Sequence, residues 1–180
     1  MPHADKTKNS DAISLLKADH RKVEGLFDRY AKSKSKTAKA KLARDICLEL
    51  AVHATIEEEL FYPAIKGTVD KEISDEAYVE HDGVKILIAE LLAGSPNDEI
   101  YDAKVTVLSE MVKHHVKEEE QRGGMFAQAK HAGEVDLVNL GAAMRTRKKE
   151  LTTQMKSAGV AAPPTRSMQG AELQHASPIA

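Results

Sequence analysis

Apolar residues recur every three or four positions in four successive stretches of the chain, and each stretch predicts an amphipathic helix. The four patterns occupy about residues 11–30, 46–64, 74–93 and 101–119, and a fifth runs from 134 to about 155. Ser10 and Asp11 suit the N-cap of the first helix, and Gly123-Gly124 interrupts the chain after the fourth. No stretch has the two-residue alternation of a half-buried strand.

The predicted fold class is therefore all-α. We expect an antiparallel, up-and-down four-helix bundle with an extra C-terminal helix and a disordered tail. The expected divisions are a flexible N-terminus at 1–10, the bundle at 11–130, the C-terminal helix at 131–156 and the disordered tail at 157–180. The tail is assigned as disordered because it has no hydrophobic period and is rich in proline and small residues.

Composition narrows the function classes. The formal net charge of −2 argues against a protein that coats nucleic acid, so no nucleic-acid partner is expected. Cys47 is the single cysteine, which excludes an intrachain disulfide and fits a reducing compartment. The first residues lack the apolar run of a signal peptide, and no apolar stretch is long enough to span a bilayer. We therefore expect a cytoplasmic protein with no membrane partner; the oligomeric state is not predicted.

Each of the four helices places one histidine on its apolar, inward face, at His20, His53, His81 and His115. Two of the helices add a glutamate four residues later, Glu57 and Glu119, and side chains four apart share a helix face. Buried carboxylates need a cation. Imidazole with carboxylate and no thiolate suits iron, manganese or zinc, and this many ligands suits two metal ions, with iron the leading choice.

Several acidic and imidazole side chains compete for places in such a site. His114 and Glu118 form a rival to His115 and Glu119, but their helix face is less apolar, so His115 and Glu119 are preferred. Glu24 could reach the metals or lie in solvent. A further set is expected at the bundle edge, where it could orient the imidazoles: Glu58, Glu59 and Glu120.

Four segments carry a family resemblance: LLKADHRKVEGLF, HATIEEELFYP, YVEHDGV and HHVKEEE. Over about residues 11–127 they resemble the hemerythrin-like, HHE cation-binding proteins. The resemblance implies two non-haem iron ions, oxo- or hydroxo-bridged, with His20, His53, His81 and His115 as ligands and with Glu57 and Glu119 as bridges. It also implies a small-molecule ligand, namely O2, NO or H2O2.

The chain departs from this family in two places. Oxygen-carrying hemerythrins have a second histidine at the position of Ala77, and here Tyr78, Glu24 or water could replace it. The fourth helix lacks the proline that usually closes an FYP-like motif and has Gly123-Gly124 instead. This predicts a looser lid beneath the site. We therefore expect peroxide or nitric oxide handling, with possible catalase-like or other di-iron redox activity, over reversible oxygen carriage. The alternative is an iron- or gas-responsive sensor or iron-handling protein.

Overall fold

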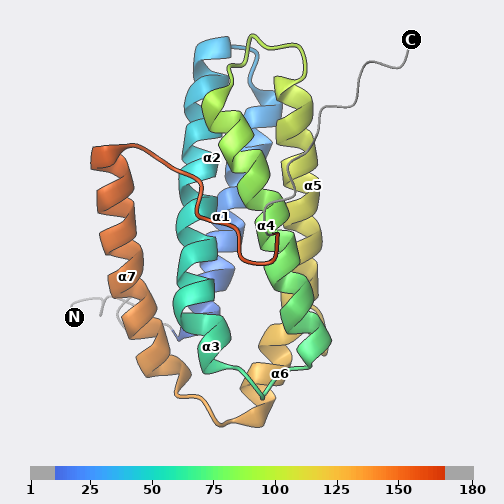
Figure 1. The fold of residues 1–180 in the computed structure, drawn as a ribbon, viewed down its shortest axis with the longest axis vertical. Coiled ribbons are helices and arrows are strands. Elements are labelled where there is room, and N and C mark those ends of the chain that lie inside the picture. Colours follow the sequence, from blue (N-terminus) through green and yellow to red (C-terminus); the bar gives the residue numbers. More distant parts are fainter. Residues whose placement is uncertain (1–10, 169–180) are drawn as a thin grey trace, which may run out of the picture.

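The computed structural model describes residues 11–168, and these form helices and loops without a strand (Figure 1). Each long helix runs opposite to its neighbour in the chain. Helix α1 packs against α2 and α5, and α4 packs against the same two helices. The predicted antiparallel bundle is thereby confirmed; its helices are α1 (Ala12–Lys32), α2 (Lys36–Ile56), α4 (Lys71–Ala93) and α5 (Tyr101–Glu120). Within the described residues, no helix combines the length and apolarity that crossing a membrane requires.

The chain stays helical beyond the end of α2 at Ile56, but its winding changes there. A π-helical turn, η1 (Glu57–Phe61), follows and leads into the short α3 (Tyr62–Ala64). The amide of Tyr62 donates to the carbonyl of Glu57, five residues back. Such a turn brings residues five apart onto the same side of the helix, and π turns are frequent at functional sites. Both Glu57 and Tyr62 are consequently buried in the bundle.

The lower end of the bundle in Figure 1 is closed by α6 (Met125–Ala132). A Cβ on Gly124 would lie 2.2 Å from the carbonyl oxygen of Glu118, so only glycine allows this sharp turn after α5. The turn buries Met125 and stacks the ring of Phe126 on His20, with centroids 5.9 Å apart. The looser lid expected from the glycines is therefore not found, because the glycines let α6 fold back tightly against the bundle.

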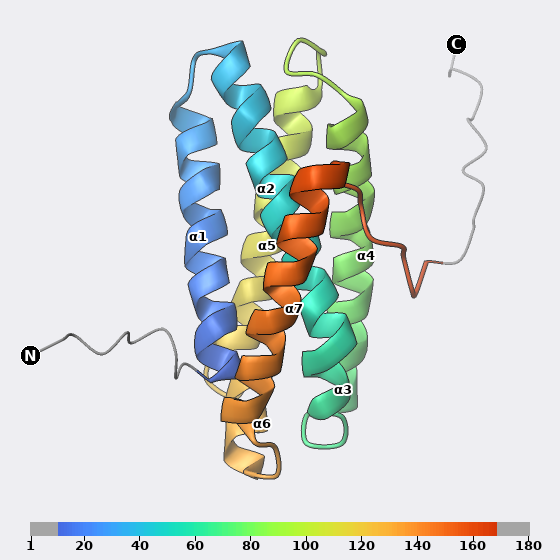
Figure 2. The same ribbon diagram turned by 90° about the vertical axis from the view of Figure 1, so that its left-hand side faces the viewer.

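Helix α7 (Leu137–Ala158) lies outside the bundle, across α1 and α2 (Figure 2). Its apolar face buries Met144 and Leu151. Two cations on the same helix pair with carboxylates of the bundle, Lys148 with Asp19 and Arg147 with Glu59. The C-terminal helix is thus part of the packed structure.

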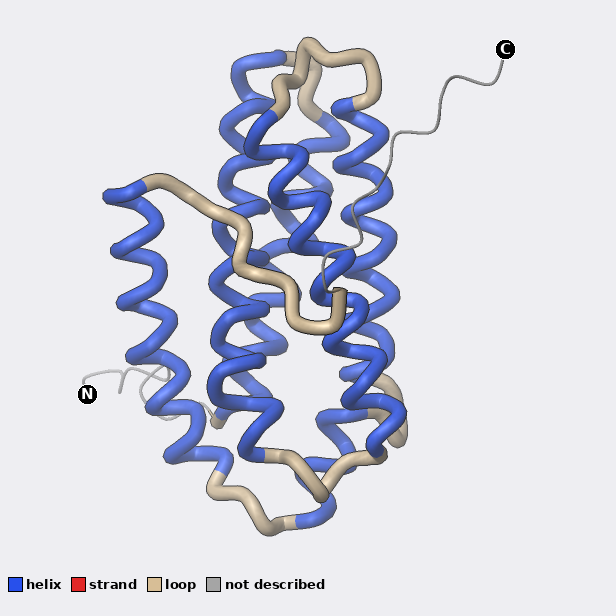
Figure 3. The backbone as a smooth tube through the Cα atoms, viewed as in Figure 1, coloured by secondary structure: helices blue, strands red, loops and turns tan. Residues whose placement is uncertain are grey.

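The segment after α7 differs from the disordered tail expected at 157–180. Ser157 and Ala158 belong to α7, and Gly159 ends that helix with a φ of +99°. Residues 159–168 then cross α2 and reach α4 (Figure 3). Composition missed this because the segment is held by one buried carboxylate, Asp82, rather than by a hydrophobic period. Residues 169–180 of the expected tail, and the expected flexible N-terminus at 1–10, lie outside the described residues.

Candidate metal centre

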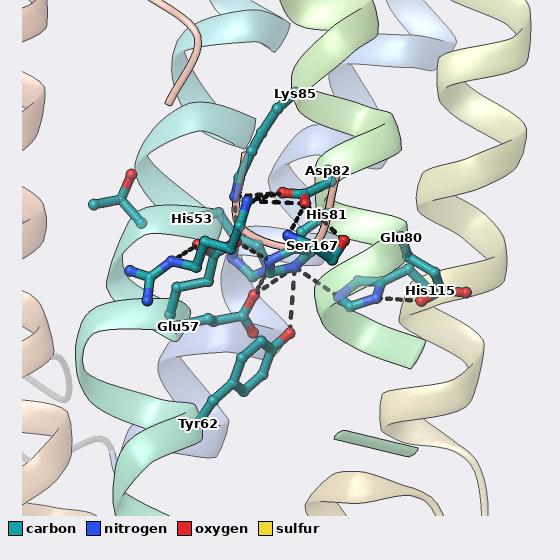
Figure 4. A network of polar contacts seen from close by, with 12 residues as sticks. His53, Glu57, Tyr62, Glu80, His81, Asp82, Lys85, His115 and Ser167 are labelled. Carbon is teal, nitrogen blue, oxygen red and sulfur yellow. Dashed lines mark hydrogen bonds and ion pairs between the residues drawn. The ribbon is translucent and has the colours of Figure 1, made fainter. Parts of the chain in front are cut away.

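Six residues of the four-helix bundle bring their side chains together inside it, and none of these residues is more than 8% exposed. Two groups of potential metal ligands result, each with its ligand atoms within 4.8 Å of one another. Glu57 belongs to both groups, and Figure 4 shows it close to His53 and His81. The first group is His20, His53, Glu57 and Glu119, and the second is Glu57, His81 and His115.

The histidines form two pairs whose Nε2 atoms face each other. These atoms are 3.2 Å apart in the pair His20 and His53, and 3.2 Å apart in the pair His81 and His115. Each glutamate spans the two pairs. Glu57 Oε2 lies 3.0 Å from His53 Nε2 and 3.3 Å from His81 Nε2, while Glu119 lies 3.3 Å from His20 Nε2 and 3.6 Å from His115 Nε2.

A second ring of carboxylates faces the Nδ1 atoms, and each carboxylate comes from a neighbouring helix. Each of these four carboxylates belongs to the residue immediately before or after an inward-facing residue of the same helix. Since an α-helix rotates by about 100° per residue, the carboxylate points toward the neighbouring helix. The contacts are His20 Nδ1 with Glu120 at 2.7 Å, His81 Nδ1 with Glu58 at 3.0 Å, His115 Nδ1 with Glu80 at 2.8 Å, and His53 Nδ1 with Asp19 at 3.8 Å.

At His20, His81 and His115 the Nδ1 hydrogen bond to this outer ring fixes which imidazole nitrogen faces inward as an acceptor. A neutral imidazole that donates from Nδ1 to a carboxylate keeps a lone pair on Nε2. The lone pairs of each histidine pair then face each other at 3.2 Å. Among the described residues, both oxygens of Glu57 and Oε2 of Glu119 also lack a hydrogen-bond donor. A cation in each group would satisfy these atoms, since ligand atoms about 3 Å apart can coordinate one metal ion at bond lengths of about 2.1 Å.

Without a metal, protons take over part of this role. Burial disfavours the charged form of His53, but the nearby carboxylates of Glu57 and Asp19 outweigh it and raise its pKa to about 10. Burial likewise opposes protonation of His81, yet Glu57 and Glu58 raise its pKa to about 9. Burial alone would raise the pKa of Glu57; the same histidines hold it well below its usual range. The centre therefore attracts cations whether they are metal ions or protons.

Tyr62 is the site residue that sequence reasoning missed. Its hydroxyl lies 3.2 Å from His81 Nε2 and donates to Glu119 Oε1 at 3.3 Å (Figure 4). Burial and then the charges of Glu57 and Glu119 raise its pKa well above the usual range. The five-residue spacing from Glu57 was the available signal, but it points inward only in a π turn.

The competing candidate ligands lie away from the six-residue centre. Tyr78 packs edge-on against Tyr62, with centroids 5.2 Å apart, and lines a surface hollow. The side chain of His114 is 61% exposed and lies 3.1 Å from Glu80 on the bundle surface, whereas His115 is inside. Glu24 pairs with Arg21 on the surface. Among the three glutamates expected at the bundle edge, Glu58 and Glu120 contact imidazoles of the centre. Glu59 instead pairs with Arg147.

A small cavity adjoins the histidines. It is walled by apolar side chains of all four bundle helices, among them Val23, Leu50, Val84 and Val112. The centre of a water-sized molecule can occupy about 20 Å³ of it, and about 10–15 Å³ is enough for one water molecule. A water-sized molecule therefore fits beside the imidazoles.

Comparison with known proteins identifies the family. A curated relative, named a DNA nickase, from Nostoc sp. is 29% identical over 106 residues, which is 59% of this chain and 30% of that protein. The chain thus spans less than a third of that relative. A solved hemerythrin HHE cation-binding domain-containing protein from Mycobacterium kansasii has the same fold, with a TM-score of 0.70, 23% identity, and coverage of 83% of this chain and 94% of that one. The family model of the hemerythrin HHE cation-binding domain matches residues 11–123, so the protein belongs to this family of cation-binding domains.

Proposed function

We propose that the centre holds two non-haem iron ions and reacts with small oxidants or nitric oxide. His20 and His53 would bind one iron, and His81 and His115 the other. Glu57 and Glu119 would bridge them, because each glutamate contacts both histidine pairs. When bound, the iron pair supplies one-electron chemistry and an open position for O2, NO or peroxide.

The hydroxyl of Tyr62 is the observation that favours peroxide or nitric oxide handling over reversible oxygen carriage. It lies beside His81, while Ala77, the position of the absent histidine, is buried and offers no ligand atom. On the side of the centre formed by His81 and His115, a metal would find only a protonated hydroxyl, a weak ligand, in place of another imidazole. An unsaturated site is suited to reaction, whereas an oxygen carrier needs a saturated and protected one.

The remaining steps belong to the chain's own residues. Tyr62 keeps its proton at Oη because its pKa is raised, and this hydroxyl lies beside His81, where it can hydrogen-bond a small oxygen species. Glu119 accepts the hydrogen bond that aims this hydroxyl. Val84 and Val112 line the adjoining cavity, so bulk water and larger molecules are excluded from the site.

The experiment is anaerobic loading of the purified protein with Fe(II), followed by metal quantification and an optical spectrum. The loaded protein is then exposed in turn to O2, NO and peroxide. We expect about two irons per chain and consumption of peroxide or formation of a nitric oxide adduct. His115→Ala should lose about one iron, and its exposed neighbour provides the matched control, since His114→Ala should retain both. A stable, reversible oxygen adduct with no peroxide consumption would refute the proposal.

A further inference from the structure

A buried carboxylate on α4 holds the segment that follows α7. Asp82 is fully buried, and its Oδ2 accepts hydrogen bonds from the amides of Arg166 at 2.9 Å, Ser167 at 2.5 Å and Met168 at 3.0 Å. The hydroxyl of Ser167 adds a bond at 2.7 Å, and the ammonium of Lys85 adds one to Oδ1 at 3.0 Å. Successive amides around one anion form a specific binding site for it.

The same segment reaches the outer ring of the metal centre. Glu58 is 4% exposed and contacts Nδ1 of His81 at 3.0 Å, Nζ of Lys85 at 2.7 Å and Nε of Arg166 at 2.6 Å. Lys85 also donates to the carbonyl of Pro164 at 3.1 Å. Figure 4 shows Lys85 and Asp82 above His81. The segment therefore lies one carboxylate away from a proposed iron ligand.

The attachment is mainly polar, which makes it reversible. Val160 and Ala162 pack against the core but stay only partly buried. In contrast, α7 buries Met144 and Leu151. Release of the segment exchanges hydrogen bonds and ion pairs for contacts with water, so only the net value of each bond is lost, because water hydrates the groups that become exposed. The segment can leave while the four helices stay packed.

We propose that residues 159–168 form a strap that controls metal exchange at the centre, an inference that rests on the proposed iron site. When docked, the strap fixes Glu58 against His81 through Arg166 and covers this side of α4. When released, it exposes Glu58 and Lys85 to water and frees the imidazole of His81 to turn away from its metal. Partners that orient a metal-bound histidine commonly change metal affinity by about 10- to 100-fold.

The test uses the full chain loaded anaerobically with Fe(II) and measures iron release to a ferrous chelator. Hydrogen–deuterium exchange of the amides of residues 166–168 reports docking separately. Ser167→Pro removes two donors to Asp82 from the strap side, where the buried residues of the bundle are untouched. Arg166→Gln keeps the amides but removes the guanidinium from Glu58. Arg147→Gln is the matched control, because it breaks an ion pair to Glu59, the residue after Glu58.

We expect slow exchange of these amides in the wild type. Ser167→Pro should lose this protection and release iron at least tenfold faster. Arg166→Gln should keep the protection and release iron about threefold faster, and Arg147→Gln should change neither. The inference is overturned if the wild-type amides exchange like those of an unstructured peptide, or if Ser167→Pro frees the strap while iron release stays within twofold. A wild-type protein that binds no iron refutes the proposed function itself, and the strap's role with it.

Discussion

Removing the metal and raising the pH should destabilise the protein. In the metal-free centre the pKa values of His53 and His81 are raised to about 10 and about 9, against about 6.5 in an unfolded chain. For a group whose pKa is raised by folding, the stabilisation is fully present below the unfolded pKa and is lost as the pH rises through the folded one. The loss should therefore extend from about pH 6.5 to about pH 10.

The size of this effect follows from the same values. Each unit of difference between the folded and unfolded pKa is worth about 1.4 kcal/mol, so His53 alone would contribute about 5 kcal/mol and His81 alone about 3 kcal/mol. Both imidazoles depend on the charge of Glu57, so the two contributions do not add. We expect the free energy of unfolding to fall by about 3–5 kcal/mol, a large part of the total of about 5–15 kcal/mol for a typical domain.

The assay is urea unfolding, followed by circular dichroism in the presence of a chelator, at one-unit steps from pH 6 to pH 10. The double variant His53→Gln/His81→Gln should show a much flatter dependence, and His114→Gln should behave like the wild type because that side chain is largely exposed. Metal affinity should change in the opposite direction and increase with pH, since bound metal displaces protons from the same imidazoles. A metal-free wild type as stable at pH 10 as at pH 6.5 would refute this reasoning.

Three other substitutions each test one contact of the centre, and one assay tests for a nucleic-acid partner. Tyr62→Phe keeps the ring but removes the hydroxyl, so peroxide consumption should fall at least tenfold while iron content stays unchanged; an unchanged rate would remove Tyr62 from the mechanism. Glu120→Gln takes the carboxylate from His20 Nδ1 and should weaken iron binding about 10- to 100-fold in chelator competition. Phe126→Ala opens the floor beneath His20 and should cost about 3–5 kcal/mol in urea unfolding, and a loss below about 1 kcal/mol would contradict the packing described. With a net charge of −2, the iron-loaded protein should leave supercoiled plasmid intact on a gel, and nicking would contradict the expected absence of a nucleic-acid partner.

The sequence predicts the bundle and the inward histidines because both depend on the three- or four-residue spacing of apolar positions within one helix. A residue such as His53 shares a helix face with its neighbours three and four positions away, so the apolar pattern alone places it in the core. The same rule favoured His115 over His114, and the structure places His115 inside and His114 at the surface. Local period also linked His53 to Glu57, which lie 3.0 Å apart.

What the sequence does not predict depends on contacts between elements. Tyr62 faces His81 because the helix changes to a π turn at Glu57. The spacing of apolar residues does not predict this change. Glu80 and Asp19 look like ordinary solvated acids at single positions, yet each faces an imidazole of an adjacent helix. The strap has no hydrophobic period, and it is held mainly by polar contacts to Asp82, Glu58 and Lys85 that no sequence pattern predicts.

Two cations from the part of the chain beyond the family match pair with carboxylates of the outer ring. Six carboxylates surround the four histidines, so their negative charge exceeds the four positive charges of two divalent ions. Lys148 of α7 pairs with Asp19, and Arg166 of the strap pairs with Glu58. Both cations lie outside residues 11–123, and each acts through one carboxylate on His53 or His81. We infer that the bundle determines which metal ligands meet, while the C-terminal third of the chain sets how firmly two of them are held.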